Sequence, residues 1–175
     1  MNILVVGGGG REHAIAASLS KSPLTTRLVV APGNPGIETF AECYPIAADD
    51  IPSQCKLARD IEADFVFIGP EIPLVLGLKD ELLKLGINAF GPSKKAAQLE
   101  GSKIFSRNFC KKYNIPQPEF KYCTEIETAK KQIELLNGYC VVKADGLAAG
   151  KGVVVCDAVD QAIIAATEML EKNKF

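Results

Sequence analysis

Short apolar runs alternate with amphipathic stretches through the first half of the chain. The apolar runs predict strands at residues 2–6, 27–31, 65–68 and 89–90. The amphipathic stretches between them predict helices at residues 11–20, 53–62 and 74–85. Strands that alternate with helices indicate a parallel sheet covered by helices on both faces. The sequence therefore predicts an α/β, Rossmann-like N-terminal domain.

The pattern changes after Gly91. Residues 91–118 read as helix and end at Pro116 and Pro118, which cannot continue a helix or a central strand. An α+β domain is predicted beyond them. The expected division is a domain at 1–101, a helical linker at 102–119 and a second domain at 120–175.

The second domain is predicted to hold a strand at 120–122, a helix opened by a capping box from Thr124 to Glu127, and a two-stranded hairpin. A last helix follows from about Ala158, with Asp157 as a candidate N-cap. Its apolar stripe consists of Val159, Ala162, Ile163, Ala166 and Leu170.

The hairpin is predicted around "KADGLAAGKGVVV", residues 143–155. A phosphate-binding P-loop would read G-x-x-x-x-G-K-[ST] and would lead into a helix. Here three residues separate Gly146 from Gly150, and Gly152 stands where a hydroxyl is needed. The valines at 153–155 favour a strand instead of a helix. The stretch therefore predicts a strand, a glycine-rich loop and a second strand.

Loops that follow the strands of parallel α/β sheets are where ligands bind. Glu12 and His13 stand where a G-x-G-x-x-G dinucleotide fingerprint needs its third glycine, so that fingerprint fails in both registers. A glycine turn at a helix N-terminus, with Arg11 beside it, suits a phosphate monoester. The alternative is a tight turn with a solvated Arg11. The loops in question are GGGGR (7–11), PGNPG (32–36) and GPE (69–71).

Two lysines are candidates for chemistry. Lys143 lies in an apolar strand that enters the glycine-rich loop, where strand alternation can direct it toward phosphates. Lys103 stands at the start of a predicted helix. The alternative for either lysine is a solvated surface side chain, although the apolar setting of Lys143 favours a function.

Composition and charge exclude several classes of function. Twenty Lys and Arg against 21 Asp and Glu give a net charge of −1, and no basic run suggests a nucleic-acid partner. No apolar stretch approaches the roughly 18 residues of a membrane span. The N-terminus lacks the basic and long apolar segments of a signal peptide. We expect a cytoplasmic protein without a nucleic-acid or membrane partner.

The cysteines predict neither a disulfide framework nor a metal site. They form no C-x-x-C pair, and His13 is the only histidine. Reduced, buried thiols are favoured over a catalytic cysteine. The six lie at positions 43, 55, 110, 123, 140 and 156.

Five stretches of the chain, in order, resemble the phosphoribosylamine–glycine ligases, or glycinamide ribonucleotide synthetases, of the ATP-grasp superfamily. The resemblance covers nearly all of the chain and implies a pre-ATP-grasp domain followed by part of an ATP-grasp lid subdomain. The stretches are "GGGGREHAIA", "APGNPG", "FIGPEIPLVLGLKDEL", "GINAFGPSKKAAQLEGSKIFSRNF" and "VVKADGLAAGKGVVV".

The resemblance also implies roles for single residues. Lys103 and Lys143 are expected to contact the ATP phosphates as catalytic residues, and His13 either faces the ligand or packs beside its helix. The phosphoribosylamine side would be formed by Gly8, Gly9, Gly10, Arg11, Glu12, His13, Asn34, Pro35, Gly36, Pro70 and Glu71. The loop that closes over ATP would be Asp145, Gly146, Leu147, Ala148, Ala149, Gly150, Lys151 and Gly152.

The implied reaction belongs to purine biosynthesis. ATP phosphorylates glycine, and 5-phosphoribosylamine attacks the glycyl phosphate to give glycinamide ribonucleotide, ADP and phosphate. The implied cofactors are ATP and Mg²⁺ or Mn²⁺, with the metal ligands expected beyond residue 175, so we expect the chain alone to be an inactive N-terminal fragment. The alternatives are a non-catalytic module that binds a phosphosugar or nucleotide, and another ATP-grasp carboxylate–amine ligase.

Overall fold

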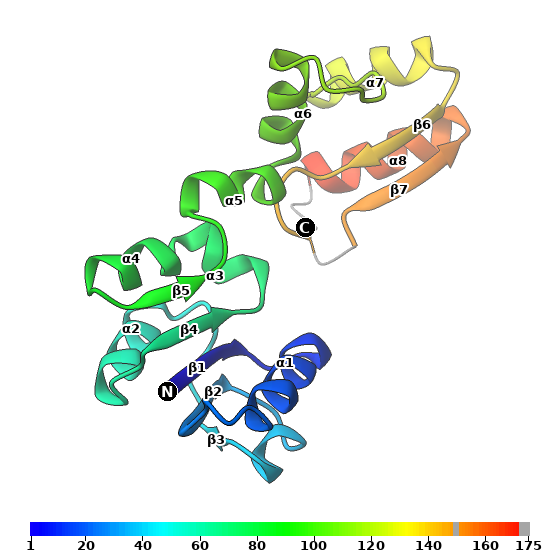
Figure 1. Ribbon diagram of the computed structural model, residues 1–175. Helices are drawn as coiled ribbons and strands as arrows, with labels where there is room; N and C mark the ends of the chain where they lie inside the picture. The colour runs from blue at the N-terminus through cyan, green and yellow to red at the C-terminus, as the bar shows by residue number, and fades with distance from the viewer. Residues whose placement is uncertain (149–150, 172–175) are drawn as a thin grey trace. The chain divides into compact units, whose positions relative to one another are not determined.

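The chain folds into two compact units, Met1–Gly101 and Ser102–Phe175 (Figure 1). The computed structural model describes residues 1–148 and 151–171. The first unit is built around a parallel sheet, and the second around an antiparallel hairpin packed on helices.

The sheet of the first unit has five parallel strands in the order β3-β2-β1-β4-β5. This arrangement confirms the predicted α/β class with a Rossmann-like domain. β3 was not predicted, because two residues are too short to give a periodic signal. The strands are β1 (Asn2–Gly7), β2 (Arg27–Pro32), β3 (Glu42–Cys43), β4 (Phe65–Ile68) and β5 (Asn88–Phe90).

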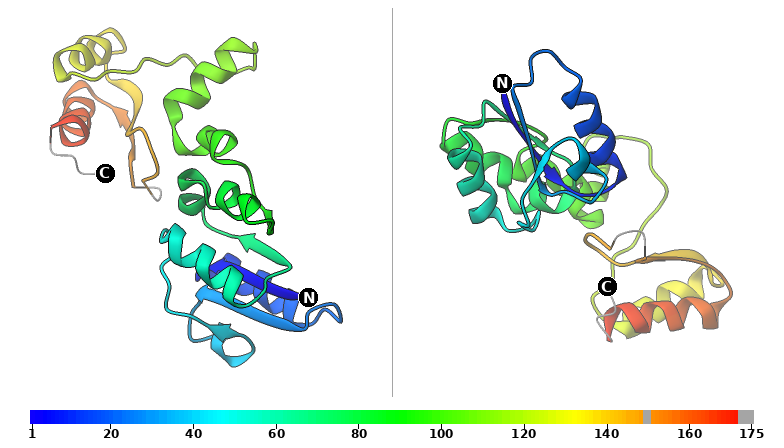
Figure 2. Two further views of the ribbon diagram at one scale, coloured as in Figure 1. Left: turned by 90° about the vertical axis from the view of Figure 1, so that its left-hand side faces the viewer. Right: turned by 90° about the horizontal axis from the view of Figure 1, so that it is seen from below.

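Helices cover both faces of this sheet because successive residues of its central strands point to opposite sides. Ile3 and Val5 pack toward α1 and the short helix η1, whereas Leu4 and Val6 pack toward α2, α4 and their neighbours (Figures 1 and 2). The helices are α1 (Gly10–Ser20), η1 (Ile37–Thr39), α2 (Ile51–Asp60), α3 (Glu71–Leu76), α4 (Leu78–Lys84) and α5 (Lys94–Gly101).

Gly77 divides the stretch at 74–85 into two helices, so the single helix predicted there is wrong. Its φ of +102° lies in the left-handed region that ends helices. The Gly77 N–H donates to the carbonyls of Pro73 and Leu74 at 3.0 and 3.1 Å, which closes the last turn of α3. A glycine within an otherwise continuous apolar pattern was the signal for this break.

The second unit packs one face of a hairpin on two helices. Val142, Val154 and the buried Cys156 lie on that inner face, and the stripe predicted for the last helix packs against them. This confirms the predicted hairpin and the apolar face of the final helix. The elements are α6 (Lys103–Lys112), α7 (Ile126–Leu135), β6 (Tyr139–Lys143), β7 (Val153–Asp157) and α8 (Val159–Leu170).

Three local predictions for the second unit are wrong. Residues 120–122 form no strand, because the prolines just before them lack ladder donors and Tyr122 is 61% exposed. α7 has Glu125 at its N-cap, with no side-chain cap, and Glu127 pairs with Lys130 instead of closing a capping box. Asp157 ends β7, and the N-cap of α8 is the next residue.

All six cysteines carry free thiols. Cys55 and Cys156 are buried and the other four are partly exposed, so the prediction of buried thiols is right for these two only. Among the residues that the structure describes, no helix combines the length and the apolar character needed to cross a membrane.

Candidate functional site

Three glycine-containing loops follow β1, β2 and β4 at one edge of the sheet. Gly33 N–H donates to the Gly7 carbonyl at 3.2 Å, and Gly69 N–H donates to the Val6 carbonyl at 3.0 Å, which holds the starts of these loops together. β1 lies between β2 and β4, so the chain places β2 and β3 on one side of it and β4 and β5 on the other. Such a switch point is where open α/β sheets bind ligands.

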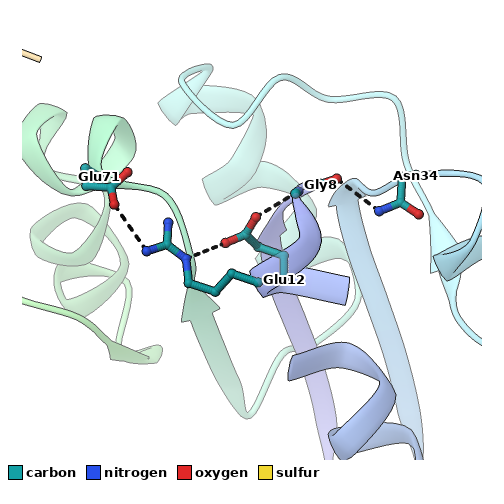
Figure 3. Close-up of polar contacts among 6 residues, drawn as sticks. Gly8, Glu12, Asn34 and Glu71 are labelled. Atoms are coloured by element: carbon teal, nitrogen blue, oxygen red, sulfur yellow. Dashed lines mark hydrogen bonds and ion pairs between the residues drawn. The ribbon is translucent and has the colours of Figure 1, made fainter. Parts of the chain in front are cut away.

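Glu12 holds the first loop in place through its buried carboxylate. The residue is only 4% exposed, and one of its carboxylate oxygens accepts from the Gly9 N–H at 2.8 Å (Figure 3). Its side chain fills the space beside two glycines, since a Cβ on Gly69 would lie 2.3 Å from Glu12 Oε1 and one on Gly7 would lie 2.6 Å from Glu12 Cγ. The short distances explain why glycine occupies both positions.

Arg11 is held between two carboxylates at the N-terminus of α1. Its Nε donates to Glu12 at 3.0 Å and its Nη1 donates to Glu71 at 3.2 Å (Figure 3). The hydrogen bond to Glu12, followed by that to Glu71, raises the pKa of Arg11. The backbone amide of Glu71, followed by Arg11, lowers the pKa of the Glu71 carboxyl. The guanidinium is thereby fixed in place while its side chain remains 56% exposed.

Asn34 fixes the second loop against the first. Its Nδ2 donates to the Gly8 carbonyl at 3.0 Å (Figure 3), and its Oδ1 accepts from the backbone N–H of Gly36 at 2.9 Å and of Ile37 at 3.1 Å. A Cβ on Gly8 would lie 2.3 Å from the Gly33 carbonyl oxygen, so the two backbones approach closely. One amide side chain thus orders both loops.

The remaining residues predicted for this side lie at the same edge. His13 is half-buried and packs on the ring of Phe40, with 5.6 Å between ring centroids. A Cβ on Gly36 would lie 2.5 Å from His13 Cε1, so the imidazole also supports the second loop. Pro35 is exposed within that loop, and Pro70 precedes α3 as its N-cap.

Lys143 lies on the outer face of the hairpin in the second unit. The residue is exposed, as are Tyr139 and Val141, which share its face of β6 by strand alternation. In the ladder Val153 is opposite Lys143 and Val155 is opposite Val141. The lysine therefore stands at the end of an exposed apolar surface, which we call the outer hairpin face, formed by Tyr139, Val141, Val153 and Val155.

Lys103 reaches the loop that follows β6. Its Nζ donates to the Gly146 carbonyl at 2.7 Å, and the neighbouring Ser102 hydroxyl donates to the Asp145 carboxylate at 3.0 Å. The structure thus brings Lys103, Asp145 and Gly146 together. Sequence reasoning passed over Ser102, although a serine directly before a helix is a strong N-cap signal.

The far side of the same loop is closed by backbone bonds. Ala144 N–H donates to the Gly152 carbonyl at 2.9 Å, and Lys151 N–H donates to the Ala148 carbonyl at 2.8 Å. Leu147 is the exposed residue after Gly146. Two residues predicted to contact ATP, Ala149 and Gly150, lie outside the described residues.

The donor set for a metal ion is not found in residues 1–148 and 151–171. They contain no group of three or more His, Cys, Asp or Glu side chains placed to hold a metal ion.

Two family models match the chain end to end. The model for the phosphoribosylglycinamide synthetase N domain matches residues 1–100, and the model for the ATP-grasp (A) domain of the same enzyme matches residues 101–175.

Named relatives and solved structures agree with these matches. The phosphoribosylamine–glycine ligases of Haemophilus influenzae and Halalkalibacterium halodurans are 46% and 43% identical to this chain, over 100% of it and 41% of their own length. The crystal structure of the phosphoribosylamine–glycine ligase of Thermotoga maritima superimposes with a TM-score of 0.77 at 28% identity, covering 98% of this chain and 40% of that one. The chain thus spans about two fifths of the length of these relatives.

Proposed function

Since the chain belongs to the phosphoribosylglycinamide synthetase family, we propose that it carries the phosphoribosyl site and part of the ATP site of a ligase of purine biosynthesis. The reaction would join glycine to 5-phosphoribosylamine, with ATP converted to ADP and phosphate. Its partners would be these small molecules in the cytoplasm, without nucleic acid or membrane.

The observation that carries this proposal is the fixed arginine at the switch point of the sheet. Glu12 and Glu71 accept two of the five guanidinium donors of Arg11, so the side chain is held while donors remain for a phosphate. The N–H groups of the first turn of α1 lie beside it, and the helix dipole favours an anion there. A 5-phosphate of an amino sugar has the charge and the size that such a site suits.

The neighbouring loops would bind the rest of the amino sugar. Asn34 orders the loop containing Pro35 and Gly36, and Pro70 leads into the turn that holds Glu71. We propose that Gly8, Gly9 and Gly10 allow the close approach of the phosphoribosyl group, because side chains are absent from that part of the loop. Glu12 would hold the first loop through its bond to Gly9, and His13 would pack against the second loop at Gly36.

The second unit would bind ATP. Lys143 and Lys103 would supply two ammonium groups for phosphate oxygens, and backbone N–H groups of the loop at 145–148 and at Gly152 would add neutral donors. The outer hairpin face beside Lys143 is exposed and apolar, and a nucleotide base would pack on it. The two lysines would be the catalytic residues of this chain, because they would contact the phosphoryl group that is transferred.

The chemistry divides into two steps. A glycine carboxylate oxygen attacks the γ-phosphorus of ATP, and the bond to the bridging oxygen breaks to release ADP and form glycyl phosphate. The 1-amino group of 5-phosphoribosylamine then attacks the acyl carbon, and inorganic phosphate leaves as the amide forms and the amine loses a proton. Phosphoryl transfer depends on positioning and charge neutralisation, which the lysines supply.

Mg²⁺ or Mn²⁺ would add charge neutralisation on the ATP oxygens when bound. The described residues do not provide a ligand set for it, so we assign no metal ligand to this chain and no step to the ion.

The proposal is tested by calorimetric titration of the chain with ribose 5-phosphate. Replacing Arg11 with Ala should weaken binding by roughly ten- to a hundredfold, since a hydrogen bond to a charged group contributes about 1.5–3 kcal/mol. Arg59→Ala, an exposed arginine in the last turn of α2, is the matched control and should bind as wild type. Equal affinities for wild type and the Arg11→Ala variant would contradict the assignment.

A further inference from the structure

The start of α6 and the loop after β6 are joined by a compact set of hydrogen bonds within the second unit. The Asp145 carboxylate accepts from the Ile104 backbone N–H at 3.1 Å and from the Ser102 hydroxyl at 3.0 Å. Ser102 Oγ in turn accepts from the Phe105 N–H at 3.1 Å, so its hydroxyl is both donor and acceptor. Both segments, the beginning of α6 and the end of β6 (labelled in Figure 1), belong to the second unit.

The ionised form of Asp145 is the one that these contacts favour. Burial raises the pKa of its carboxyl, but hydrogen bonds from the Ile104 backbone, the Ser102 hydroxyl and the Lys103 backbone together lower it below its usual range. A carboxylate at a helix N-terminus also interacts favourably with the helix dipole. Asp145 thus acts as a second cap of α6, supplied from 41 residues further along the chain.

Lys103 is bonded to the residue that follows Asp145. Lys103 is the first residue of α6, and its Nζ donates to the carbonyl of Gly146, the residue after Asp145. Gly146 has φ of +96°, which a side chain would make strained. Asp145 and Gly146 are therefore bonded to the start of α6 through the side-chain carboxylate of the first and the backbone carbonyl of the second.

We propose that Asp145 is a positioning residue for Lys103. It holds the first turn of α6 against the chain two residues beyond Lys143, and so fixes the position of the Lys103 ammonium group. This inference rests on the proposed function, because it takes the lysines to be ATP ligands. It differs from a direct role for Asp145 in ATP binding, since the carboxylate is engaged by protein donors.

Competitive acetylation of lysines, read by mass spectrometry, tests the proposal on the 175-residue chain. The rate at Lys103 reports how firmly its ammonium group is held. In Asp145→Ala we expect Lys103 to react several-fold faster, and in Asp145→Asn, which retains one acceptor oxygen, the rate should lie between those of Asp145→Ala and wild type. Asp157→Ala, at the other end of the hairpin, is the matched control and should leave the rate unchanged.

Lys130 on α7, paired with Glu127 at 2.7 Å, reports general loosening of the unit. An unchanged Lys103 rate in Asp145→Ala would overturn the proposal, and so would an equal acceleration at Lys103 and Lys130. The series is repeated with increasing MgATP. The ATP concentration that half-protects Lys103 should rise about tenfold in Asp145→Ala, and an unshifted value would also overturn the proposal.

This experiment tests the nucleotide assignment and the positioning role of Asp145 independently. If MgATP protects neither Lys103 nor Lys143 in wild type, the nucleotide assignment is wrong. The rates without ATP still decide whether Asp145 holds Lys103.

Discussion

Replacing Glu12 with Gln tests whether one buried carboxylate organises the phosphoribosyl site. The side chain keeps its shape, but an amide presents one NH₂ group where both partners, the Gly9 N–H and the Arg11 Nε–H, are donors. In either orientation of the amide one donor faces another donor. The variant therefore loses at least one of these two hydrogen bonds, and the one that it keeps goes to a neutral acceptor.

The expected cost follows from the exposure of the partners. The bond from Gly9 to the buried carboxylate contributes about 1.5–3 kcal/mol. The pair with Arg11 contributes about 0.5 kcal/mol, because the arginine side chain is 56% exposed and solvent screens it. We expect Glu12→Gln to lower the free energy of unfolding of the first unit by about 1–2 kcal/mol, because its amide oxygen can still accept from the Gly9 N–H, in a weaker, neutral hydrogen bond, while the pair with Arg11 is lost. Glu12→Ala should cost at least as much, since it also leaves space beside Gly7 and Gly69.

The assay is amide hydrogen exchange of β1, whose buried residues report the opening of the sheet. Glu38→Gln is the control, since Glu38 is an exposed acid of the same unit. Protection of β1 in Glu12→Gln within about 0.5 kcal/mol of wild type would refute the reasoning, because substitutions without a structural role fall in that range.

Three further predictions address the same loops. Gly69→Ala should destabilise the first unit by about 1–3 kcal/mol in urea unfolding, because its Cβ would overlap Glu12. The control Gly10→Ala, whose Cβ meets no atom within 4 Å, should not destabilise the unit. Equal effects of the two substitutions would contradict the prediction. Asn34→Ala should lower the free energy of unfolding of the first unit by about 1–2 kcal/mol, since it leaves the Gly8 carbonyl without its hydrogen bond. The same variant should bind ribose 5-phosphate more weakly in calorimetry, and an unchanged affinity would contradict the role of Asn34 in ordering the loops. The lowered pKa of Glu71 means that its contribution to stability is present above about pH 4.3 and is lost as the pH falls through the folded-state pKa. Thermal unfolding of Glu71→Gln should therefore change less between pH 6 and pH 3 than that of wild type, and parallel curves would exclude this contribution.

Patterning was sufficient for β1, β2, β4 and β5 and for the hairpin, but not for the two-residue β3. The β-branched runs at β1 and β2 are buried on both faces, so burial and local propensity favour the same structure there. The glycine-rich loop was read as part of a hairpin because Val153 to Val155 favour a strand, and the ladder from Lys143 to Val153 confirms it.

The failures of sequence reasoning lie where a contact from a distant segment decides the structure. Asp157 and Thr124 are good caps by type, but neither caps its helix, whereas Asp145 and Ser102 together cap α6 from two segments. Periodicity carries no information on a pairing across 41 residues. The role of Glu12 as a buried anchor was hidden for the same reason, because the glycines that make room for it come from the ends of two different strands.

The central claim is that these 175 residues carry the phosphoribosyl site and catalytic lysines of a glycine ligase. The most direct measurement places residues 1–175 in the Haemophilus influenzae relative, in exchange for the matching 41% of its length, and follows ADP release by the folded chimera. We predict turnover that requires both glycine and 5-phosphoribosylamine and that is lost on replacing Lys143 with Ala but kept with Lys130→Ala. A folded chimera that binds ribose 5-phosphate without releasing ADP would contradict the claim and favour a non-catalytic binding module.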